Sequence, residues 1–357
     1  MLRPAYHAWL HRFAVLTAVA TLGLIGLGGL VTSKGAGLAV PDWPTTYGYN
    51  MFTFPISQWV GGIFWEHTHR LLASLVGLLT TVLAVWLWRK DPRPWLRGLG
   101  VAAFFGVVLQ GVLGGLRVVW LKDEIGIFHA ALAQSFLVLV SVLALVTGGG
   151  WQRIGAQAAA FQVPTGLRRL VLATTLVIFA QLVLAATMRH QHAGLAIPDF
   201  PLAYGRVWPA TGTEAIARYN QQRLEVAAAN PITAFQVTLQ MVHRLVALAI
   251  LALVSISAWQ AWRQLGARHP GTRLAILWSG LVCAQVGLGA WTIWSNKAAD
   301  ITTLHVVVGA SSLVVGALLS LVACHGARQR NPEGVATAGR CKIGQALAGP
   351  STLTACK

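Results

Sequence analysis

The sequence predicts an all-α integral membrane protein: eight transmembrane helices arranged as two pseudo-symmetric four-helix bundles, with both termini in the cytoplasm. Three observations predict it. The 357 residues are 55% hydrophobic and 10% charged, with a mean hydropathy of +0.62, whereas soluble domains carry about 25% charged residues. Long apolar segments recur along the chain, and the second half of the sequence repeats motifs of the first.

Eight segments are apolar enough to span a hydrocarbon core about 30 Å thick, which takes about 20 residues each. The first follows a basic N-terminus and is too long for a signal-peptide core, so we expect it to remain as a membrane helix. The eight segments are residues 11–32, 64–88, 95–118, 126–147, 167–188, 234–262, 272–294 and 302–324. Residues 326–357 lack apolar periodicity and are expected to form a largely disordered cytoplasmic tail.

The distribution of charge predicts the orientation of the helices. The net charge is +17, and most Lys and Arg residues fall at one set of helix ends, which the positive-inside rule assigns to the cytoplasm. The other set holds eight of the ten acidic residues, including Asp42, Asp123 and Asp199. The positive charge therefore reports topology and attraction to lipid headgroups, which argues against nucleic-acid binding.

An internal repeat divides the chain. Residues 37–44 (GLAVPDWP) recur as residues 194–201 (GLAIPDFP), at an offset of 157 residues, whereas later motifs recur at offsets of 174 to 176. The later pairs are His69 with His243, Arg70 with Arg244, Gln110 with Gln285 and His129 with His305. The larger offset indicates an insertion within residues 207–232, where Thr213 to Ala229 predicts a short soluble helix that starts with an N-cap.

The repeat also predicts the domain organisation. Four spans per half is an even number, so the two halves share one orientation and are related by an axis along the membrane normal. We expect residues 1–150 and 151–325 to form two four-helix bundles side by side. Residues 326–357 follow as the tail.

Four histidines are candidate iron ligands. His69, His129, His243 and His305 each fall early in a segment that runs from the outside inwards, so they lie at a similar depth near the outer leaflet. Two imidazoles facing each other across an apolar bundle suit axial ligation of haem iron. Zinc is a poor fit because no third or fourth ligand repeats with them. The alternative is that the histidines only hydrogen-bond between helices.

An ionisable cluster opens the second span. Glu66, His69 and Arg70 share one helix face at spacings of three and four residues, and such groups in a membrane helix indicate a functional site. The carboxylate of Glu66 corresponds to an amide in the second half, Gln240, so the first half is the candidate reaction site. Alternatively, Glu66 only pairs with Arg70. The guanidinium groups of Arg70 and Arg244 are candidates for binding haem propionates.

The remaining motifs have simpler interpretations. The two GLAxPD loops are expected to form lids over the outer mouths of the bundles, or turns with an aromatic anchor at the interface. His67 has no histidine twin and is expected to be a bystander, whereas His190 and His192 are interpreted as polar loop residues. No cysteine pair is placed to form a structural disulfide or a zinc site.

Together these residues resemble the haem A synthase family, which converts haem O to haem A for cytochrome oxidase. The resemblance covers residues 10–325 and rests on Glu66-x-x-His69-Arg70, His129, His243-Arg244, His305, the GLxxPD loops and the run QGVLGG at residues 110–115. It implies haem b as a cofactor on His243 and His305, and a substrate site with His69, His129 and the essential carboxylate of Glu66. Some members carry a cysteine pair in the first outer loop, but residues 33–60 contain none.

The resemblance also implies the reaction and its setting. The C8 methyl group of haem O is oxidised to a formyl group, and the expected location is the bacterial cytoplasmic membrane, with the haem sites towards the periplasmic side. The implied partners are haem O, membrane lipid, an external electron acceptor, haem O synthase and cytochrome oxidase subunits. Two alternatives are a dihaem b-type electron-transfer cytochrome and a haem carrier for oxidase assembly. The similar depth of the four histidines argues against the first alternative, because transmembrane electron transfer places haems at both leaflets.

Overall fold

The computed structural model describes residues 7–156, 163–222 and 231–328. These residues form helices and no strand, and eight helices are long and apolar enough to cross a membrane, which confirms the predicted number of spans. The eight are α1 (Ala8–Ser33), α2 (Gly61–Lys90), α3 (Pro94–Trp120), α4 (Asp123–Thr147), α6 (Thr165–His190), α8 (Ala234–Leu265), α9 (Pro270–Trp294) and α10 (Ala299–Arg328).

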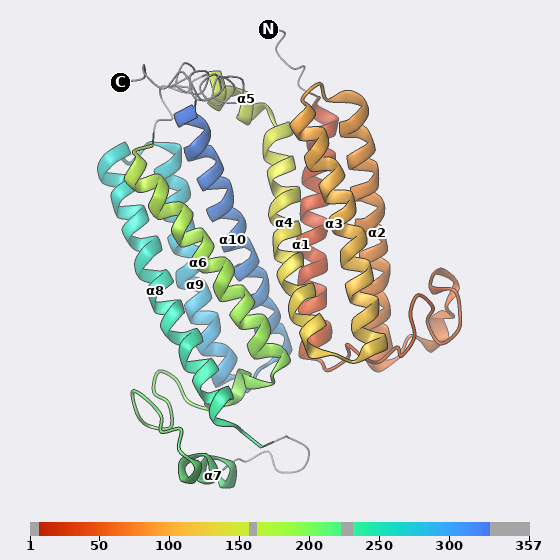
Figure 1. The fold of residues 1–357 in the computed structure, drawn as a ribbon, viewed down its shortest axis with the longest axis vertical. Helices are drawn as coiled ribbons and strands as arrows, with labels where there is room; N and C mark the ends of the chain where they lie inside the picture. Colours follow the sequence, from red (N-terminus) through yellow and green to blue (C-terminus); the bar gives the residue numbers. More distant parts are fainter. Residues whose placement is uncertain (1–6, 157–162, 223–230, 329–357) are drawn as a thin grey trace, which may run out of the picture.

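The long helices pack in two groups (Figure 1). The first helix group is α1 to α4, and the second helix group is α6, α8, α9 and α10. The groups meet where α1 packs on α10 and α4 packs on α6 and α10. The start of α1 and the end of α10 lie at one end of the molecule. Loop 1 (residues 34–60) and the described residues of loop 2 (191–222 and 231–233) lie at the other, which we call the loop end.

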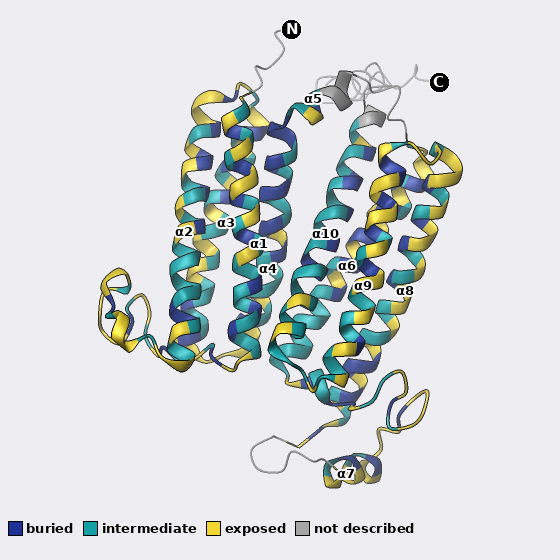
Figure 2. Cartoon of the chain, turned by 180° about the vertical axis from the view of Figure 1, so that it is seen from behind, coloured by how far each residue is buried: buried dark blue, intermediate teal, exposed yellow. Residues whose placement is uncertain are grey.

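The outer faces of the helices carry many exposed residues (Figure 2), and large apolar side chains are among them. At most 44% of the most apolar window of any of the eight helices is buried inside the protein, and large side chains such as Leu78, Phe105 and Leu248 are 59–63% exposed. Exposed apolar surface on every span is stable only against lipid. The described helices are therefore built for a multi-pass membrane protein.

Two apolar cores hold the groups together. The first contains Leu83 of α2 and Leu137 of α4, and it takes in Ala310 of α10, so the second group contributes to the core of the first. The second contains Trp278 of α9, which is fully buried and donates a hydrogen bond from Nε1 to the Ser312 carbonyl at 2.8 Å. A buried indole needs such a partner, and this bond fixes α9 against α10.

A compact polar turn joins α2 to α3. Asp91 is buried and accepts three hydrogen bonds from Arg93, from the backbone N–H, Nε and Nη2, at 2.7–3.0 Å. Burial alone would raise the pKa of Asp91, but the hydrogen bonds and the charges of Arg93 and Arg97 hold it below its usual range. Pro94 then occupies the first turn of α3, where its missing N–H costs nothing.

Loop 1 and loop 2 contain the same turn. Asp42 accepts hydrogen bonds from the N–H groups of Tyr47 and Gly48, and Asp199 accepts them from Tyr204 and Gly205. Burial raises the pKa of Asp42, but these bonds and one from Thr45 hold it below its usual range. Each tyrosine hydroxyl also donates to a loop carbonyl, that of Ala39 in loop 1 and that of Ala196 in loop 2.

The short elements differ from the prediction. The helix expected from Thr213 to Ala229 is α7 (Thr213–Gln221), and its N-cap is Gly212 rather than Thr213, without a capping side chain. Residues 223–230 lie outside the described residues. The ring of Tyr219 on α7 stacks on Tyr204 of loop 2, with centroids 3.5 Å apart. This stack holds α7 against the turn at Tyr204 within loop 2, and α7 lies at the loop end (Figure 1).

A helix that the sequence did not predict follows the first group. It is α5 (Gly149–Ala156), and its Trp151 is buried in the first core, 4.1 Å from the ring of His325 on α10. Two glycines at its start are poor helix formers, so burial of the indole ring is what favours the helix. Of the predicted tail, residues 326–328 continue α10, and residues 329–357 lie outside the described residues.

Candidate functional site

The four candidate histidines lie about two turns from the loop end of their helices. His69 is on α2, His129 on α4, His243 on α8 and His305 on α10. In the first group a charge on His129 would act on His69, and in the second group a charge on His305 would act on His243. The structure therefore brings the histidines together as two pairs, one in each group.

Each of the four imidazoles keeps a buried nitrogen without a hydrogen-bond partner. The Nδ1 atoms of His69, His129, His243 and His305 are all inaccessible and unpaired. Leaving a buried polar atom unpaired costs about 1–3 kcal/mol, so four at matched positions indicate a ligand that the helices are arranged to receive. Neutral imidazoles paired across an apolar bundle are the donor set of bis-histidine haem, so the residues present fit that group.

Glycines on neighbouring helices leave room for these rings. A Cβ at Gly114 of α3 would lie 3.4 Å from Cε1 of His129, and one at Gly289 of α9 would lie 3.2 Å from Cε1 of His305. These two glycines are counterparts in the repeat. Gly28 of α1 packs as closely on His69, where a Cβ would lie 3.0 Å from Cε1. A side chain at Gly28 or Gly289 would press on the imidazole, whereas a Cβ at Gly114 would just touch it.

Amides fix the backbone that carries two of the histidines. Nε2 of Gln110 on α3 donates to the carbonyl of His129 at 3.1 Å, and Nε2 of Gln181 on α6 donates to the carbonyl of His243 at 2.9 Å. Both bonds cross between helices and leave the imidazole rings free. They position the histidines without using their nitrogens.

Glu66 is buried and both of its oxygens are hydrogen-bonded. Oε1 accepts Nη2 of Arg70 at 2.8 Å in an ion pair, and Oε2 accepts the backbone N–H of Val40 in loop 1 at 2.9 Å. The alternative interpretation, in which Glu66 pairs with Arg70, is thus present in the structure. The carboxylate lies at the junction of α2 and loop 1, one helical turn from His69 towards the loop end.

Arg70 donates hydrogen bonds to loop 1. Its Nη1 donates to the carbonyls of Asp42 and Thr45 at 2.7 and 3.0 Å, and its Nη2 donates to Val40 and Glu66 at 2.9 and 2.8 Å. Arg244 does the same in loop 2, donating to Leu202 and Asp199. These bonds give both arginines the role of loop anchors, and their predicted contact with propionates stays a prediction.

His67 also holds loop 1. Its side chain is fully buried, its Nδ1 lies 3.3 Å from the hydroxyl of Thr46, and its ring lies between Phe54 and Trp59, with centroids 5.1 and 4.6 Å away. The sequence interpretation of a bystander set it apart from the candidate iron ligands. It overlooked this structural role, which only the folded loop reveals.

His190 was predicted to be a polar loop residue, and this prediction was wrong. It is the last residue of α6, its side chain is 9% exposed, and its ring packs on Gly126 of α4, where no Cβ would fit. Nδ1 lies 3.9 Å from Oδ1 of Asp123. The apolar segment ends earlier in the sequence than the helix does, so hydropathy alone could not place this residue. His192 is an exposed loop residue, as predicted.

Two arginines near the site were missed. Arg117 lies in the last turn of α3 beside Gly37 of loop 1. Arg189 is the last residue but one of α6, and its Nη2 donates to the carbonyl of Gly29 and the hydroxyl of Ser33 on α1. Both break the repeat, because they correspond to Thr292 and Thr32. That asymmetry is the signal by which the sequence could have revealed them.

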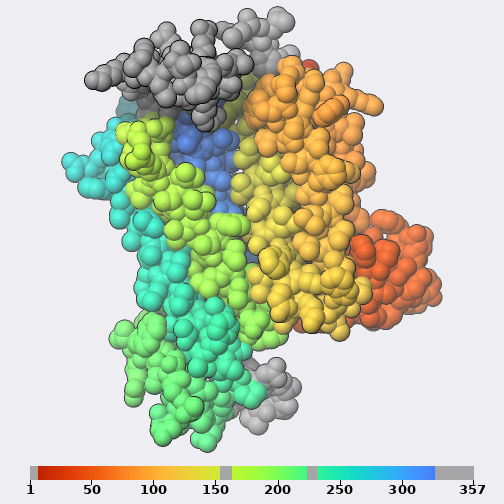
Figure 3. All heavy atoms as spheres, viewed as in Figure 1, coloured from red at the N-terminus to blue at the C-terminus, as the bar shows by residue number. Residues whose placement is uncertain are grey.

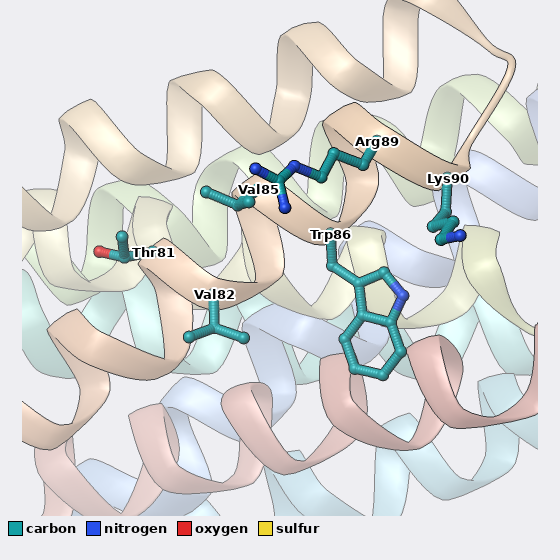
Figure 4. A pocket seen from close by; sticks show the side chains of 6 residues that line it. All are labelled: Thr81, Val82, Val85, Trp86, Arg89 and Lys90. Carbon is teal, nitrogen blue, oxygen red and sulfur yellow. The ribbon is translucent and has the colours of Figure 1, made fainter.

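A hollow of the surface lies elsewhere. It is on α2 near the end opposite to the loop end, between Thr81 and Lys90, and is lined by apolar side chains and Arg89 (Figure 4). Thr81 is 15 residues beyond Glu66, which is about 22 Å along the helix. The hollow therefore has no part in the histidine sites.

The residues that define the site all lie within a match to a protein family. The model of the COX15-CtaA family, described as cytochrome oxidase assembly protein, matches residues 11–318. The chain belongs to this family. The match covers most of each of the eight spans and all four histidines, and the predicted resemblance to the haem A synthase family is confirmed.

Several relatives of this family are named heme A synthase. The chain is 31% identical over 216 residues to the protein from Shouchella clausii, covering 59% of this chain and 69% of that one. It is 25% identical over 309 residues to that of Alkalihalophilus pseudofirmus, covering 85% and 93%. It is 27% identical over 305 residues to that of Geobacillus kaustophilus, covering 82% and 84%.

Proposed function

We propose that this protein is a haem A synthase, which oxidises the C8 methyl group of haem O to the formyl group of haem A. The observation that carries the proposal is the pair of buried imidazoles in each helix group, each ring with an unpaired nitrogen. Membership of the cytochrome oxidase assembly family and the relatives named heme A synthase support it. The overall conversion adds one oxygen atom and removes four electrons, with water as a sufficient oxygen source and an external acceptor for the electrons.

The two groups take different roles in this proposal. The first group, within residues 1–150, binds haem O through His69 and His129. The second group, within residues 151–325, holds haem b through His243 and His305. When bound, haem b would supply one-electron redox chemistry to the second group. The similar depth of the four histidines supports a short path between the two sites. The two helix groups meet along α1, α4, α6 and α10.

Glu66 is the proposed catalytic carboxylate. Gln240 occupies the corresponding place in the second group and accepts the N–H of Ile197, as Glu66 accepts the N–H of Val40. An amide therefore suffices to hold the loop. The carboxylate adds a negative charge that can stabilise positive charge developing at the methyl carbon or accept a proton from attacking water.

The proposed setting is the bacterial cytoplasmic membrane, with both termini in the cytoplasm and the histidine sites near the outer surface. The distribution of Lys and Arg supports this orientation. Loop 1 and loop 2 then lie outside as lids, and loop 1 projects sideways from the first group (Figure 3). The exposed faces of the spans accommodate lipid and leave the farnesyl tail of haem O within the membrane. The proposed partners beyond haem O are haem O synthase and cytochrome oxidase subunits.

Extraction of haem tests the proposal. Membranes that contain this protein and a haem O synthase, in a host without its own haem A synthase, should yield haem A or its hydroxylated precursor. The matched control is the His69→Ala/His129→Ala variant at the same expression level, which should accumulate haem O. Haem O alone from the wild-type protein, with haem b bound, would instead favour an electron-transfer cytochrome.

A further inference from the structure

Arg117 covers the loop side of the first histidine pair. It lies on the same face of α3 as Gly114, on which His129 packs, and about 4.5 Å closer to the loop end. Its guanidinium lies beside Gly37 of loop 1, where a Cβ would be 3.2 Å from Nη1. The positive charge of Arg117 acts on both His69 and His129. The guanidinium therefore stands between the imidazole pair and loop 1.

The guanidinium of Arg117 forms no hydrogen bond or ion pair within the described residues. The residue is only partly exposed. The two carboxylates that act on it are Glu66, whose oxygens are both taken, and Asp123, which is 55% exposed and lies beside His190. A guanidinium at this depth is costly unless it meets an anion.

Arg189 adds to the same excess of positive charge. It interacts electrostatically with Arg117, its Nη2 meets only neutral oxygens of α1, and its Nε is buried without a partner. Neither arginine has a basic counterpart in the repeat. The excess positive charge is thus found only in the first group and where α6 meets it. It is not a feature that the two histidine pairs share.

We propose that Arg117 binds a propionate carboxylate of haem O and so positions the substrate; this rests on the proposed function. Arg70 has all four Nη bonds engaged with loop 1 and Glu66, which leaves Arg117 as the guanidinium free to receive a carboxylate through its planar fork. The C8 methyl shares its pyrrole ring with one propionate. A propionate held at Arg117 therefore sets that methyl at the loop side of the imidazole pair, the side on which Glu66 lies.

Haem O and its dimethyl ester separate this contact from other contributions to binding. Purified full-length protein that retains its haem b is titrated with each ligand, and binding is followed by the Soret absorbance. Charge-assisted hydrogen bonds are worth about 1.5–3 kcal/mol, so wild-type protein should bind haem O about ten- to hundredfold more tightly than the ester. Arg117→Gln should remove the preference, Arg117→Lys should keep part of it, and Arg263→Gln, at the opposite end of α8, should leave it unchanged.

Equal binding of haem O and its ester to wild-type protein would overturn the proposal, and this comparison needs no variant to fold. An undiminished preference in Arg117→Gln would overturn it as well. Competition by phosphatidylglycerol for haem O in wild-type protein, lost in Arg117→Gln, would assign the site to a lipid phosphate instead. Conversion of haem O to haem A by wild-type protein is measured separately, so absence of haem A refutes the proposed function whatever the ester shows.

Discussion

Glu66 and Gln240 hold the two outer loops by the same hydrogen bond. Glu66 accepts the N–H of Val40 at 2.9 Å, and Gln240 accepts the N–H of Ile197 at 2.7 Å. The position thus has a structural role in both groups that does not require a charge. The carboxylate appears only beside the first histidine pair, which separates loop anchoring from the chemistry that we propose for Glu66.

Replacement of Arg70 should loosen loop 1. Arg70→Gln removes four hydrogen bonds and leaves Glu66 as a buried carboxylate without its counter-ion, so we expect a loss of stability on the order of 3 kcal/mol. Faster amide exchange confined to residues 38–49, measured by hydrogen–deuterium exchange in detergent, should report it. Arg244→Gln, which leaves no buried carboxylate behind, is the control and should have a smaller effect. Equal effects of the two changes would contradict this account.

A methyl group at Gly289 should disturb the haem b site. The added Cβ would lie 3.2 Å from Cε1 of His305, so Gly289→Ala should displace the imidazole and shift the Soret and α bands of bound haem b. Gly287→Ala on the same helix meets nothing within 4 Å and should leave the spectrum unchanged. Identical spectra for both variants would show that the close glycine contact is unimportant.

The histidine pairs should be separable by their ligands. His243→Ala should lose haem b, because the remaining His305 offers a single axial ligand. His69→Ala should keep haem b and lose binding of haem O. Haem b content is measured by the pyridine haemochrome spectrum of purified protein. Full retention of haem b in His243→Ala would refute the assignment of the second group.

The turn at Asp91 should make the stability of the protein depend on acid pH. Its pKa is depressed in the folded protein, so the stabilisation is present above the unfolded pKa of about 4 and is lost as the pH falls through the lower folded value. Thermal unfolding between pH 3 and pH 7 should therefore show a steeper acid loss for wild-type protein than for Asp91→Asn. The variant should be less stable at neutral pH. Parallel pH profiles would count against the Asp91–Arg93 pairing.

The sequence predicted the spans and the histidines because both depend on local pattern. An apolar run of about 20 residues indicates a transmembrane helix. The repeat placed four histidines at one depth: His69, His129, His243 and His305. The role of Arg70 could not be read in this way, since its acceptors belong to a loop that folds back over the helix. The same holds for His67, whose neighbours Phe54 and Trp59 belong to that same loop.

The contact between the two groups was the least predictable part of the site. His190 and Arg189 lie past the apolar core of their segment, and only the packing of α6 on α4 and α1 buries them. In α5, two glycines obscured a helix that is held by the burial of Trp151. Hydropathy does not encode these tertiary contacts, and the repeat marks only Arg189, as a position where the two halves differ.

The most direct test of the central claim is the haem extracted from Glu66→Gln. The twin position shows that glutamine can accept the loop N–H, so this variant should fold, retain haem b and bind haem O. The carboxylate is absent, so it should form haem A at less than about one hundredth of the wild-type rate, as expected for loss of an acid–base or charge-stabilising group. Gln240→Glu should stay active. Wild-type amounts of haem A from Glu66→Gln would contradict the claim that the carboxylate performs the chemistry.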